Sequence, residues 1–378
     1  MIYLYLLAGV LMALAITSAF LPLIRRLALA VRAVDYPGGR RLQAEGIPRL
    51  GGVAVIAGML TAQAVLVVLL WNHWTTHLTP LELVAIPLAV GIVFACGLIE
   101  DTVGLSPLFR IALQAIAAVV VIRAGWCINP SSLPFLGPEF ETPCWILTLL
   151  WIVGVTNAVN LLDGLDGLAG GVTAIIATGL GIFALGTGNI VAAVAMSTMV
   201  GACLGFLRKN WSPAQIYLGD SGSLTLGFLL AIVSVHASLK ISAVAAILFP
   251  ILALGLPVFD TLLVMVFRFR KKIRTPMLRR VASVFRADRS HLHHLMLRLG
   301  LNRSRIVVGI YAVTVTFCAL ALIAATYRNM ALGIAFMLFE LAVVFAIRHL
   351  GLHAEVLSAP INKRKKLKAL LFGEQHGN

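Results

Sequence analysis

Charged residues are scarce in this chain. Only 12% of its 378 residues are charged and 60% are hydrophobic, whereas a soluble domain carries about 25% charged residues. A deficit of this size, kept up over this length, excludes a soluble globular protein. It indicates that lipid surrounds most of the chain.

Cysteine is also rare, with five residues and no C-x-x-C pair, which argues against a cysteine-rich metal site. Cys96, Cys203 and Cys318 fall within apolar runs, where we expect them to pack as small hydrophobic residues. Cys127 and Cys144 flank the one sizeable outside loop, 124–143. A disulfide between these two stays open, since a bacterial periplasm would permit it.

Long apolar runs are abundant. A helix that spans a bilayer needs about 20 mostly apolar residues, and about eleven runs approach that length. The fifth of them is the shortest. They lie at 2–24, 50–71, 80–98, 108–123, 144–156, 168–186, 189–207, 222–239, 241–267, 305–326 and 331–348. With no visible internal repeat or linker, the sequence predicts an all-α polytopic membrane protein with a single transmembrane domain over 1–378.

The basic residues are distributed unevenly. If the N-terminus is outside and the chain crosses eleven times, as about eleven runs suggest, all 30 Lys and Arg except Arg123, Lys240 and Arg328 fall in inside segments. These segments are 25–49, 99–110, 208–220, 268–305 and 348–378. The positive-inside rule then predicts a periplasmic N-terminus and a cytoplasmic C-terminus in the inner membrane. The net charge of +15 therefore needs no nucleic-acid partner, and the basic tail 349–378 lies beside anionic lipid.

The first span is expected to stay attached to the protein. It has no basic residues before it, unlike a secretory signal peptide, and Arg25 and Arg26 follow it instead. Polar residues concentrate in the inside loops, of which 268–304 is the longest. This asymmetry predicts an active site on the cytoplasmic side.

Two acidic motifs lie at the inner membrane boundary. Glu100 and Asp101 end the third run, and adjacent carboxylates there are costly without a cation or a basic partner. A simple helix-end charge is the alternative for this pair. Asp220 stands between glycines at the start of the eighth run, where it is either a helix N-cap or an oxygen ligand of the kind that suits Mg²⁺.

A polar stripe runs through residues 157–168. Asp163 and Asp166 are three residues apart, so on a helix they share a face, and Asn157 and Asn160 repeat that spacing. A helix-capping loop would account for one Asn and one Asp but not for the whole stripe. The spacing therefore predicts a ligand site.

Three histidines within four residues, His291, His293 and His294, lie in the long inside loop close to Arg286 and Arg289. Zinc would need further Cys or His ligands at suitable spacing, and the inside segments supply no obvious fourth. Charge-assisted bonds to phosphate oxygens fit the mixture of His and Arg better. A plain juxtamembrane basic patch is the remaining alternative.

Taken together, these carboxylates, amides, histidines and arginines suit metal-assisted chemistry on a phosphorylated substrate. Phosphoryl transfer requires charge neutralisation and positioning more than a protein nucleophile, and no Cys or Ser nucleophile motif is present. A membrane transporter is the alternative from another class. It would place ionisable residues at mid-membrane and pair them across repeats, whereas most acids here cluster at one interface.

In these motifs the chain resembles the polyprenyl-phosphate N-acetylhexosamine-1-phosphate transferase superfamily (glycosyltransferase family 4). The Asn-x-x-Asn-x-x-Asp-Gly-x-Asp-Gly-Leu string at 157–168 is highly specific, and the early loop with Asp35-Tyr36-Pro37 and 47–52 adds to it. His-x-His-His resembles the undecaprenyl-phosphate GlcNAc-1-phosphate transferases. The branch that uses N-acetylmuramoyl-pentapeptide usually shows three consecutive histidines and ten spans.

The resemblance implies a role for each matched position. Asp220 matches a Mg²⁺ ligand, and Asn160 and Asp163 belong to the nucleotide-sugar and metal region. Asn157 would bind substrate, as would Arg289, His291, His293 and His294 of the diphosphate-binding loop. Glu100 and Asp101 match an acidic pair near the lipid phosphate, and they would be catalytic together with Asp163 and Asp166. The chain departs from the family at Glu100, where an aspartate is usual.

The resemblance implies a transferase of sugar-1-phosphate from a UDP-sugar to undecaprenyl phosphate, with UMP released. GlcNAc is the expected sugar and Mg²⁺, or Mn²⁺ in its place, the expected cofactor. Such a reaction would be the first membrane step of a cell-surface polysaccharide such as an O-antigen. N-acetylfucosamine, N-acetylgalactosamine and N-acetylmuramoyl-pentapeptide remain alternatives, an inactive relative is a further one, and a homodimer stays open.

Overall fold

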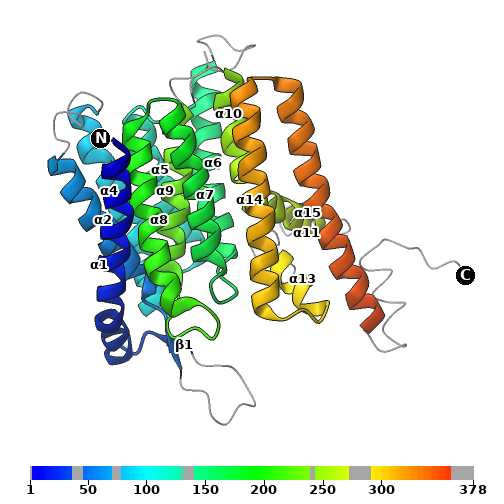
Figure 1. Ribbon diagram of the computed structural model, residues 1–378. Helices are drawn as coiled ribbons and strands as arrows, with labels where there is room; N and C mark the ends of the chain where they lie inside the picture. Colours follow the sequence, from blue (N-terminus) through cyan, green and yellow to red (C-terminus); the bar gives the residue numbers. More distant parts are fainter. Residues whose placement is uncertain are drawn as a thin grey trace, which may run out of the picture.

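The computed structural model describes residues 2–35, 46–69, 78–128, 130, 140–238, 243–271 and 291–358. Across these ranges the chain is helical apart from short connections and one two-stranded ribbon (Figure 1). The helices are α1 (Ile2–Ala30), α2 (Gly51–Leu69), α4 (Pro80–Thr102), α5 (Pro107–Arg123), α6 (Glu141–Leu161), α7 (Leu168–Gly186), α8 (Ile190–Asn210), α9 (Gly219–Ser238), α10 (Ala243–Ala253), α11 (Gly255–Lys271), α13 (Leu292–Arg298), α14 (Arg303–Tyr327) and α15 (Met330–Ser358).

The fold class expected from the sequence is confirmed. Among the described residues, nine helices are long and apolar enough to cross a membrane: α1, α2, α4, α6, α7, α8, α9, α14 and α15. As far as its residues are described, each of the eleven apolar runs falls largely in helix, including the short fifth run, which extends to the 21 residues of α6. The fourth run forms the 17-residue α5.

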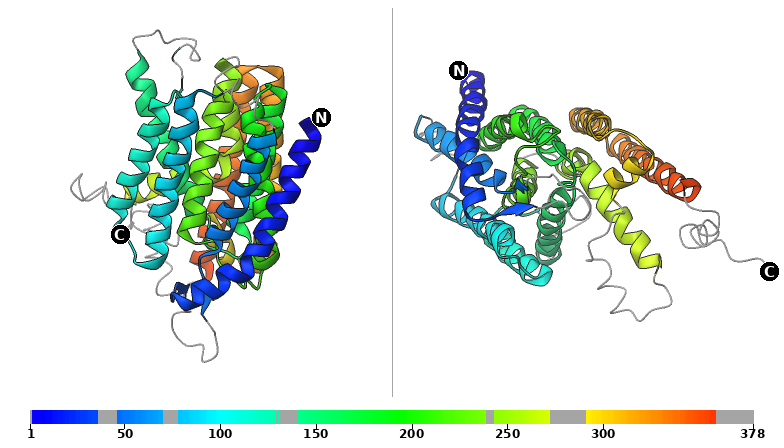
Figure 2. Two further views of the ribbon diagram at one scale, coloured as in Figure 1. Left: turned by 90° about the vertical axis from the view of Figure 1, so that its left-hand side faces the viewer. Right: turned by 90° about the horizontal axis from the view of Figure 1, so that it is seen from below.

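The ninth run differs from the expectation of one continuous span. Residues 241–267 contain two helices, α10 and α11, which meet at Leu254. Two prolines explain the break, because Pro250 lies inside α10 and Pro257 follows the junction. A proline removes a backbone donor and clashes with the preceding turn. In the view from below, α11 extends away from the main bundle (Figure 2).

The bundle is built around α9. Among the spanning helices it is the most completely buried, and it packs against α2, α4, α6, α7 and α8. Figure 2 shows this ring from below, with α14 and α15 side by side at its flank. Small and aliphatic side chains dominate the interior, as expected where helices pack by close approach in lipid.

A short ribbon joins the early loop to the start of α9. Strand β1 (Val34–Asp35) pairs antiparallel with β2 (Ile47–Pro48). Beyond β2, Gly51 and Gly52 donate backbone hydrogen bonds to the carbonyls of Tyr217 and Leu218, and Tyr217 donates to Pro48. The ribbon lies at the end of the bundle opposite the N-terminus (Figure 1). It thereby fixes the segment that leads into α9.

Candidate active site

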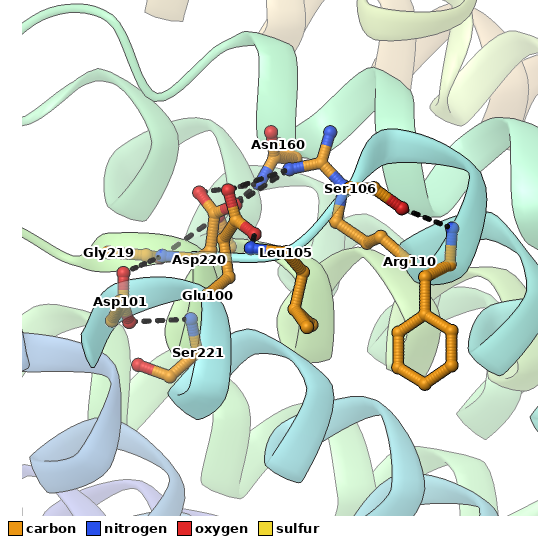
Figure 3. A network of polar contacts seen from close by, with 11 residues as sticks. Glu100, Asp101, Leu105, Ser106, Arg110, Asn160, Gly219, Asp220 and Ser221 are labelled. Carbon is orange, nitrogen blue, oxygen red and sulfur yellow. Dashed lines mark hydrogen bonds and ion pairs between the residues drawn. The ribbon is translucent and has the colours of Figure 1, made fainter. Parts of the chain in front are cut away.

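The acidic motifs predicted from the sequence meet at the first turn of α9 (Figure 3). Glu100 and Asp101 come from the last turn of α4, and Arg110 from the first turn of α5. Asn160 comes from the end of α6, and Asp220 from the beginning of α9. Residues 120 positions apart in the sequence are therefore brought within hydrogen-bonding distance.

Asp101 is bound to the backbone of α9. Its two carboxylate oxygens accept hydrogen bonds from the amides of Asp220 at 2.8 Å and Ser221 at 2.9 Å. The side chain is buried, with 6% of the residue exposed. The first amides of a helix have no partner within the helix, and a carboxylate there is further stabilised by the helix dipole. Asp101 thus caps α9 from a different helix and fixes the position of Asp220.

Asp220 presents its carboxylate to polar partners. Arg110 Nη1 lies 2.8 Å from Oδ2, and Asn160 Nδ2 lies 3.1 Å from Oδ1. Asn160 also donates to Ser223 Oγ at 3.0 Å. The Asp220 side chain remains 28% exposed, so it can still meet a ligand. The structure therefore brings two of the predicted site residues, Asn160 and Asp220, into direct contact.

Glu100 contacts the α4–α5 connection, whereas its neighbour Asp101 contacts the backbone of α9. Its Oε2 accepts a hydrogen bond of 2.6 Å from the Leu105 amide, and its Oε1 lies 3.9 Å from Arg110 Nη1. The predicted pair of carboxylates is therefore split, since Asp101 contacts α9 and Glu100 contacts the connection and Arg110.

Asp163 and Asp166 lie in the turn between α6 and α7. Burial, together with the nearby carboxylates of Asp220 and Asp101, raises the pKa of the Asp163 carboxyl from its ordinary 3.8 to about 7. Asp166 accepts a hydrogen bond of 3.2 Å from the Ala214 amide in the α8–α9 connection. Asp163 therefore belongs to the electrostatic environment of Asp220, while Asp166 links the α6–α7 turn to the α8–α9 connection.

Asn157 is placed one turn deeper than Asn160. Its Nδ2 donates to Gln114 Oε1 at 2.5 Å and to the Val153 carbonyl at 2.8 Å. Gln114 lies on α5, one turn beyond Arg110, and is fully buried. Within the described residues, Asn157 therefore bridges α6 and α5, one helical turn deeper in the bundle than Asn160.

The histidine motif begins α13 and contacts the α6–α7 turn. His291 Nδ1 lies 3.0 Å from Asp260 Oδ2, and Asp260 Oδ1 accepts from the Leu292 amide at 3.1 Å. The His293 ring lies so close to Gly164 that no side chain would fit there. The structure therefore places His293 beside the loop that carries Asp163 and Asp166. Arg289 and Arg286 lie outside the described residues.

The histidines do not form a uniformly cationic group. Burial lowers the pKa of His293 to about 3, with the neighbouring His294 and His291 rings adding to the effect. His293 is therefore neutral near pH 7 and can offer hydrogen bonds but no charge. The rings of His293 and His294 lie 4.2 Å apart between centroids.

Three residues of this region were not singled out from the sequence. Arg110, Gln114 and Ser223 all contact predicted site residues. Arg110 offered one signal, as it is the single basic residue of the inside segment 99–110. The disulfide between Cys127 and Cys144, which the sequence left open, is not formed, because both are free thiols.

The donor types fit a hard cation. Asp220, Asp163 and Asn160 supply oxygen atoms, and the mutual repulsion of the carboxylates is the kind that a cation relieves. Within the described part of the chain, no group of three or more His, Cys, Asp or Glu side chains is gathered tightly enough to hold a metal ion by itself. Mg²⁺ typically uses one or two carboxylates and takes its remaining ligands from water and substrate phosphates, so the two observations agree.

The fold and the site together define a polytopic membrane protein with an acidic, asparagine-containing site at one end of its bundle. Residues 83–238 match the family described as Glycosyl transferase family 4. A probable undecaprenyl-phosphate N-acetylglucosaminyl 1-phosphate transferase of Bacillus subtilis is 32% identical over 306 residues, covering 80% of either chain. The chain belongs to this family of polyprenyl-phosphate N-acetylhexosamine-1-phosphate transferases, as its motifs suggested.

Two further relatives show the breadth of the family. A decaprenyl-phosphate N-acetylglucosaminephosphotransferase of Mycobacterium leprae is 35% identical over 311 residues, or 75% of either chain. A phospho-N-acetylmuramoyl-pentapeptide-transferase of Desulforamulus reducens is 32% identical over 238 residues, or 59% of this chain and 70% of the relative. The N-acetylglucosamine enzymes therefore match over the longer part of this chain.

Proposed function

We propose that this protein transfers N-acetylglucosamine 1-phosphate from UDP-N-acetylglucosamine to undecaprenyl phosphate and releases UMP. The main supporting observation is the arrangement of Asp220, Asn160 and Arg110 around the first turn of α9. Asp163 and the histidine motif lie next to this group. The names of the Bacillus subtilis and Mycobacterium leprae relatives support the sugar.

The reaction exchanges one phosphoanhydride bond for another. An oxygen of the lipid phosphate attacks the sugar-proximal phosphorus of the UDP-sugar, and the bond between that phosphorus and the bridging oxygen breaks. UMP leaves with the electron pair of that bond, and polyprenyl-diphospho-N-acetylglucosamine remains. The lipid phosphate is already ionised near neutral pH, so a one-step displacement needs little help from a base.

The residues of the site have separate tasks in this scheme. Asp220, supported by Asp163, would hold a Mg²⁺ ion, which would neutralise charge on the diphosphate and on the leaving phosphate. Asn160 holds the Asp220 carboxylate in place. Asp101 positions α9 through two backbone amides. The neutral His293 is suited to donating a hydrogen bond to a diphosphate oxygen beside Gly164.

We also propose that the site faces the cytoplasm across a bacterial inner membrane. The inside segments, as defined by the positive-inside rule, are those that carry Glu100, Arg110, Asp220 and the histidine motif. A nucleotide sugar is a cytoplasmic metabolite, which agrees with this orientation.

A direct assay tests the proposal. Purified protein would be incubated with Mg²⁺, undecaprenyl phosphate and, in separate reactions, UDP-N-acetylglucosamine, UDP-N-acetylgalactosamine, UDP-N-acetylfucosamine and UDP-N-acetylmuramoyl-pentapeptide. We expect UMP release with UDP-N-acetylglucosamine and none without the lipid. Absence of UMP with every donor would overturn the proposed activity, and release with another donor alone would overturn the sugar.

A further inference from the structure

A buried acid lies within α15, outside the site described above. Glu340 is 0% exposed, although α15 is the least buried of the spanning helices among the described residues. Within the same part of the chain, neither of its carboxyl oxygens has a hydrogen-bond partner. Ionisable side chains inside a membrane are costly, and where they occur they usually face the protein interior and serve a function. Glu340 therefore needs a physical explanation.

The carboxyl of Glu340 faces the break between α10 and α11. Its Oε2 lies so close to Gly255, the first residue of α11, that a Cβ on this glycine would overlap it. Cys318 of α14 lies within electrostatic range of the same carboxyl, and its thiol contacts the Ala253 carbonyl at 3.9 Å. The acid is therefore placed where α10, α11, α14 and α15 meet and the helical backbone is interrupted.

The surroundings of Glu340 favour its neutral form. An unpaired carboxylate in a low-dielectric interior is strongly unfavourable. Arg348, a buried basic residue further along α15, is about 12 Å away along the helix axis, and its guanidinium lies over the Phe267 ring. A neutral carboxylic acid has one O–H to donate. This donor in turn needs an acceptor inside the bundle.

The break in the helix supplies an acceptor. In a continuous helix the Ala253 carbonyl would accept from the residue four positions on, but this residue is Pro257, which has no N–H. A carbonyl has two lone pairs and a thiol is only a weak donor, so this oxygen can accept a stronger hydrogen bond. Inside a membrane, backbone groups freed by proline are satisfied by neighbouring helices.

We propose that Glu340 is a neutral acid that donates a hydrogen bond from its O–H to the Ala253 carbonyl and thereby fixes the angle between α10 and α11. The acid would supply from α15 the donor that Pro257 lacks. Its side chain is unbranched and long enough to reach the break while its helix remains at the edge of the bundle. Glu340 is then a positioning residue for whatever α11 carries.

The helix α11 carries the anchor of the histidine motif. Asp260 on α11 accepts hydrogen bonds from the Leu292 amide and pairs with His291 Nδ1 at the start of α13. The helix α15 also contacts α13 directly, since a Cβ on Gly351 would be 2.6 Å from Leu295 Cβ. The direction of α11 therefore decides where the histidines lie relative to the α6–α7 turn.

Two substitutions separate hydrogen bonding from charge and size. Glu340→Gln keeps a neutral donor of the same length, and Glu340→Met keeps the length without a donor. Glu340→Gln should melt as the unaltered protein does. Glu340→Met should melt about 2–4 °C lower, because the Ala253 carbonyl loses its donor. A loss in Glu340→Gln as large as in Glu340→Met would show that negative charge is required and would overturn the inference.

Infrared spectroscopy reports the protonation state of the acid directly. The difference spectrum between the unaltered protein and Glu340→Gln near neutral pH should contain the carbonyl stretch of a protonated carboxylic acid. The other acids of the chain cancel in this difference. Absence of the band would show that Glu340 is ionised, and the inference would fail.

Kinetics test the link to the histidine motif, which rests on the proposed function. Glu340→Met is expected to raise KM for UDP-N-acetylglucosamine about 10-fold, the effect of losing a hydrogen bond to a charged group, and to leave KM for undecaprenyl phosphate unchanged. Glu340→Gln should restore the ordinary value. A smaller folded fraction would lower kcat alone. An unaltered KM for the UDP-sugar in Glu340→Met would therefore rule out the positioning role.

Pro257→Ala tests the choice of acceptor. It returns an N–H to the Ala253 carbonyl, so Glu340→Met should lower the melting temperature less in this background. Pro250→Ala is the matched control, because its N–H would serve a carbonyl further back in α10. Equal losses in the two backgrounds would contradict the proposed hydrogen bond. If no donor yields UMP but the infrared and melting results are as expected, the activity fails and the hydrogen bond of Glu340 stands.

Discussion

At the scale of single residues, four acids of one site have different environments. Asp101 accepts hydrogen bonds from two backbone amides, Glu100 is bound to Leu105, Asp220 is partly exposed beside Arg110, and Asp163 is partly buried close to other carboxylates. The four acids therefore cannot all have the same role in the reaction. Asp220 is the best placed to meet a cation, and Asp101 is the best placed to hold the fold.

Asp220→Asn should abolish turnover in a folded protein. The amide keeps the size of the side chain but removes the negative charge that a cation and Arg110 both require. Losing one electrostatic contact of this kind typically costs about 10²–10³-fold in kcat. UMP release and a thermal melt in detergent would be measured on the same preparation. Turnover close to that of the unaltered protein would rule out the metal role of Asp220.

Asp101→Asn should differ from Asp220→Asn in its stability. An amide oxygen can accept from the α9 amides, but the Asn NH₂ group would face the second amide as a donor. Losing a charged cap costs about 0.5–2 kcal/mol. We therefore expect a lower melting temperature, with activity lost in proportion to the folded fraction. A normal melting temperature with no activity would instead indicate a direct chemical role for Asp101.

Asp163 should make stability depend on pH. Its pKa is about 7 in the folded protein and 3.8 ordinarily, so between these values the folded state binds more protons than the unfolded state. Stability from this group is therefore lost as the pH rises from about 4 to 7, and is level above that. Asp163→Asn removes the effect.

The comparison of Asp163→Asn with the unaltered protein cancels the other groups. His293 has a lowered pKa and so opposes Asp163 at acid pH, but both proteins carry it. The melting temperature of the variant relative to the unaltered protein should rise between pH 5 and 7. A difference that is constant across this range would contradict the raised pKa of Asp163.

At the scale of secondary structure elements, the site depends on how closely α4 approaches α9. Gly97 on α4 lies against the backbone of α9, and a Cβ added there would be 2.5 Å from the Asp220 carbonyl oxygen. Gly97→Ala should therefore separate the helices and pull Asp101 away from the α9 amides. Overpacking of this kind typically costs about 1–3 kcal/mol. Melting temperature and UMP release should both fall.

Gly91→Ala is the control for that substitution. It lies on the same helix, and a Cβ there meets nothing within 4 Å. Since alanine also favours helix over glycine, this variant should melt no lower than the unaltered protein. Equal effects of the two substitutions would mean that the α4–α9 contact does not govern the site.

The sequence predicts the helices well and their interruptions less well. Apolar runs locate the spans because lipid requires about 20 apolar residues per crossing. Hydropathy does not report backbone donors, so the break at Leu254 escaped the prediction. Pro257 cannot donate to the Ala253 carbonyl, and the Cys318 thiol lies 3.9 Å from that oxygen. The partner of this carbonyl therefore comes from α14, which is distant in the sequence, and no local pattern around Pro257 reveals it.

The same limit applies to the site. The motifs predicted which segments carry chemistry, because carboxylates and amides at a membrane boundary need a reason to be there. They did not show that Asp101 caps α9 while Asp220 is the candidate cation ligand. The reason is that Asp101 contacts Asp220 and Ser221, which lie about 120 residues away in the sequence. Arg110 was overlooked for the same reason. Its partner Asp220 is 110 residues away.

At the scale of the whole molecule, the connections that carry the site gather at one end of the bundle. The connections after α4, α6 and α8 carry the acidic motifs, and β1 lies at that end (Figure 1). The end of α14 lies at the opposite one (Figure 1). If the positive-inside rule sets the orientation, the first end is cytoplasmic and the second periplasmic. This follows from charge alone and is independent of the proposed reaction.

Labelling with a membrane-impermeant maleimide tests the orientation in whole cells. Gln215 is exposed in the α8–α9 connection, beside Ala214, which bonds to Asp166. Tyr327, the last residue of α14, is 72% exposed at the opposite end. In a Cys127→Ser background, Tyr327→Cys should react in intact cells, and Gln215→Cys should react only after the membrane is permeabilised.

One substitution, Cys127→Ser, is enough to prepare this labelling background. Apart from Cys127, which is partly buried, all are buried: Cys96, Cys144, Cys203 and Cys318. The Cys127→Ser protein alone should therefore stay unlabelled in both conditions. Labelling of Gln215→Cys in intact cells would place the acidic site outside, where no nucleotide sugar is supplied. The proposed cytoplasmic reaction would then be excluded even if the purified protein released UMP.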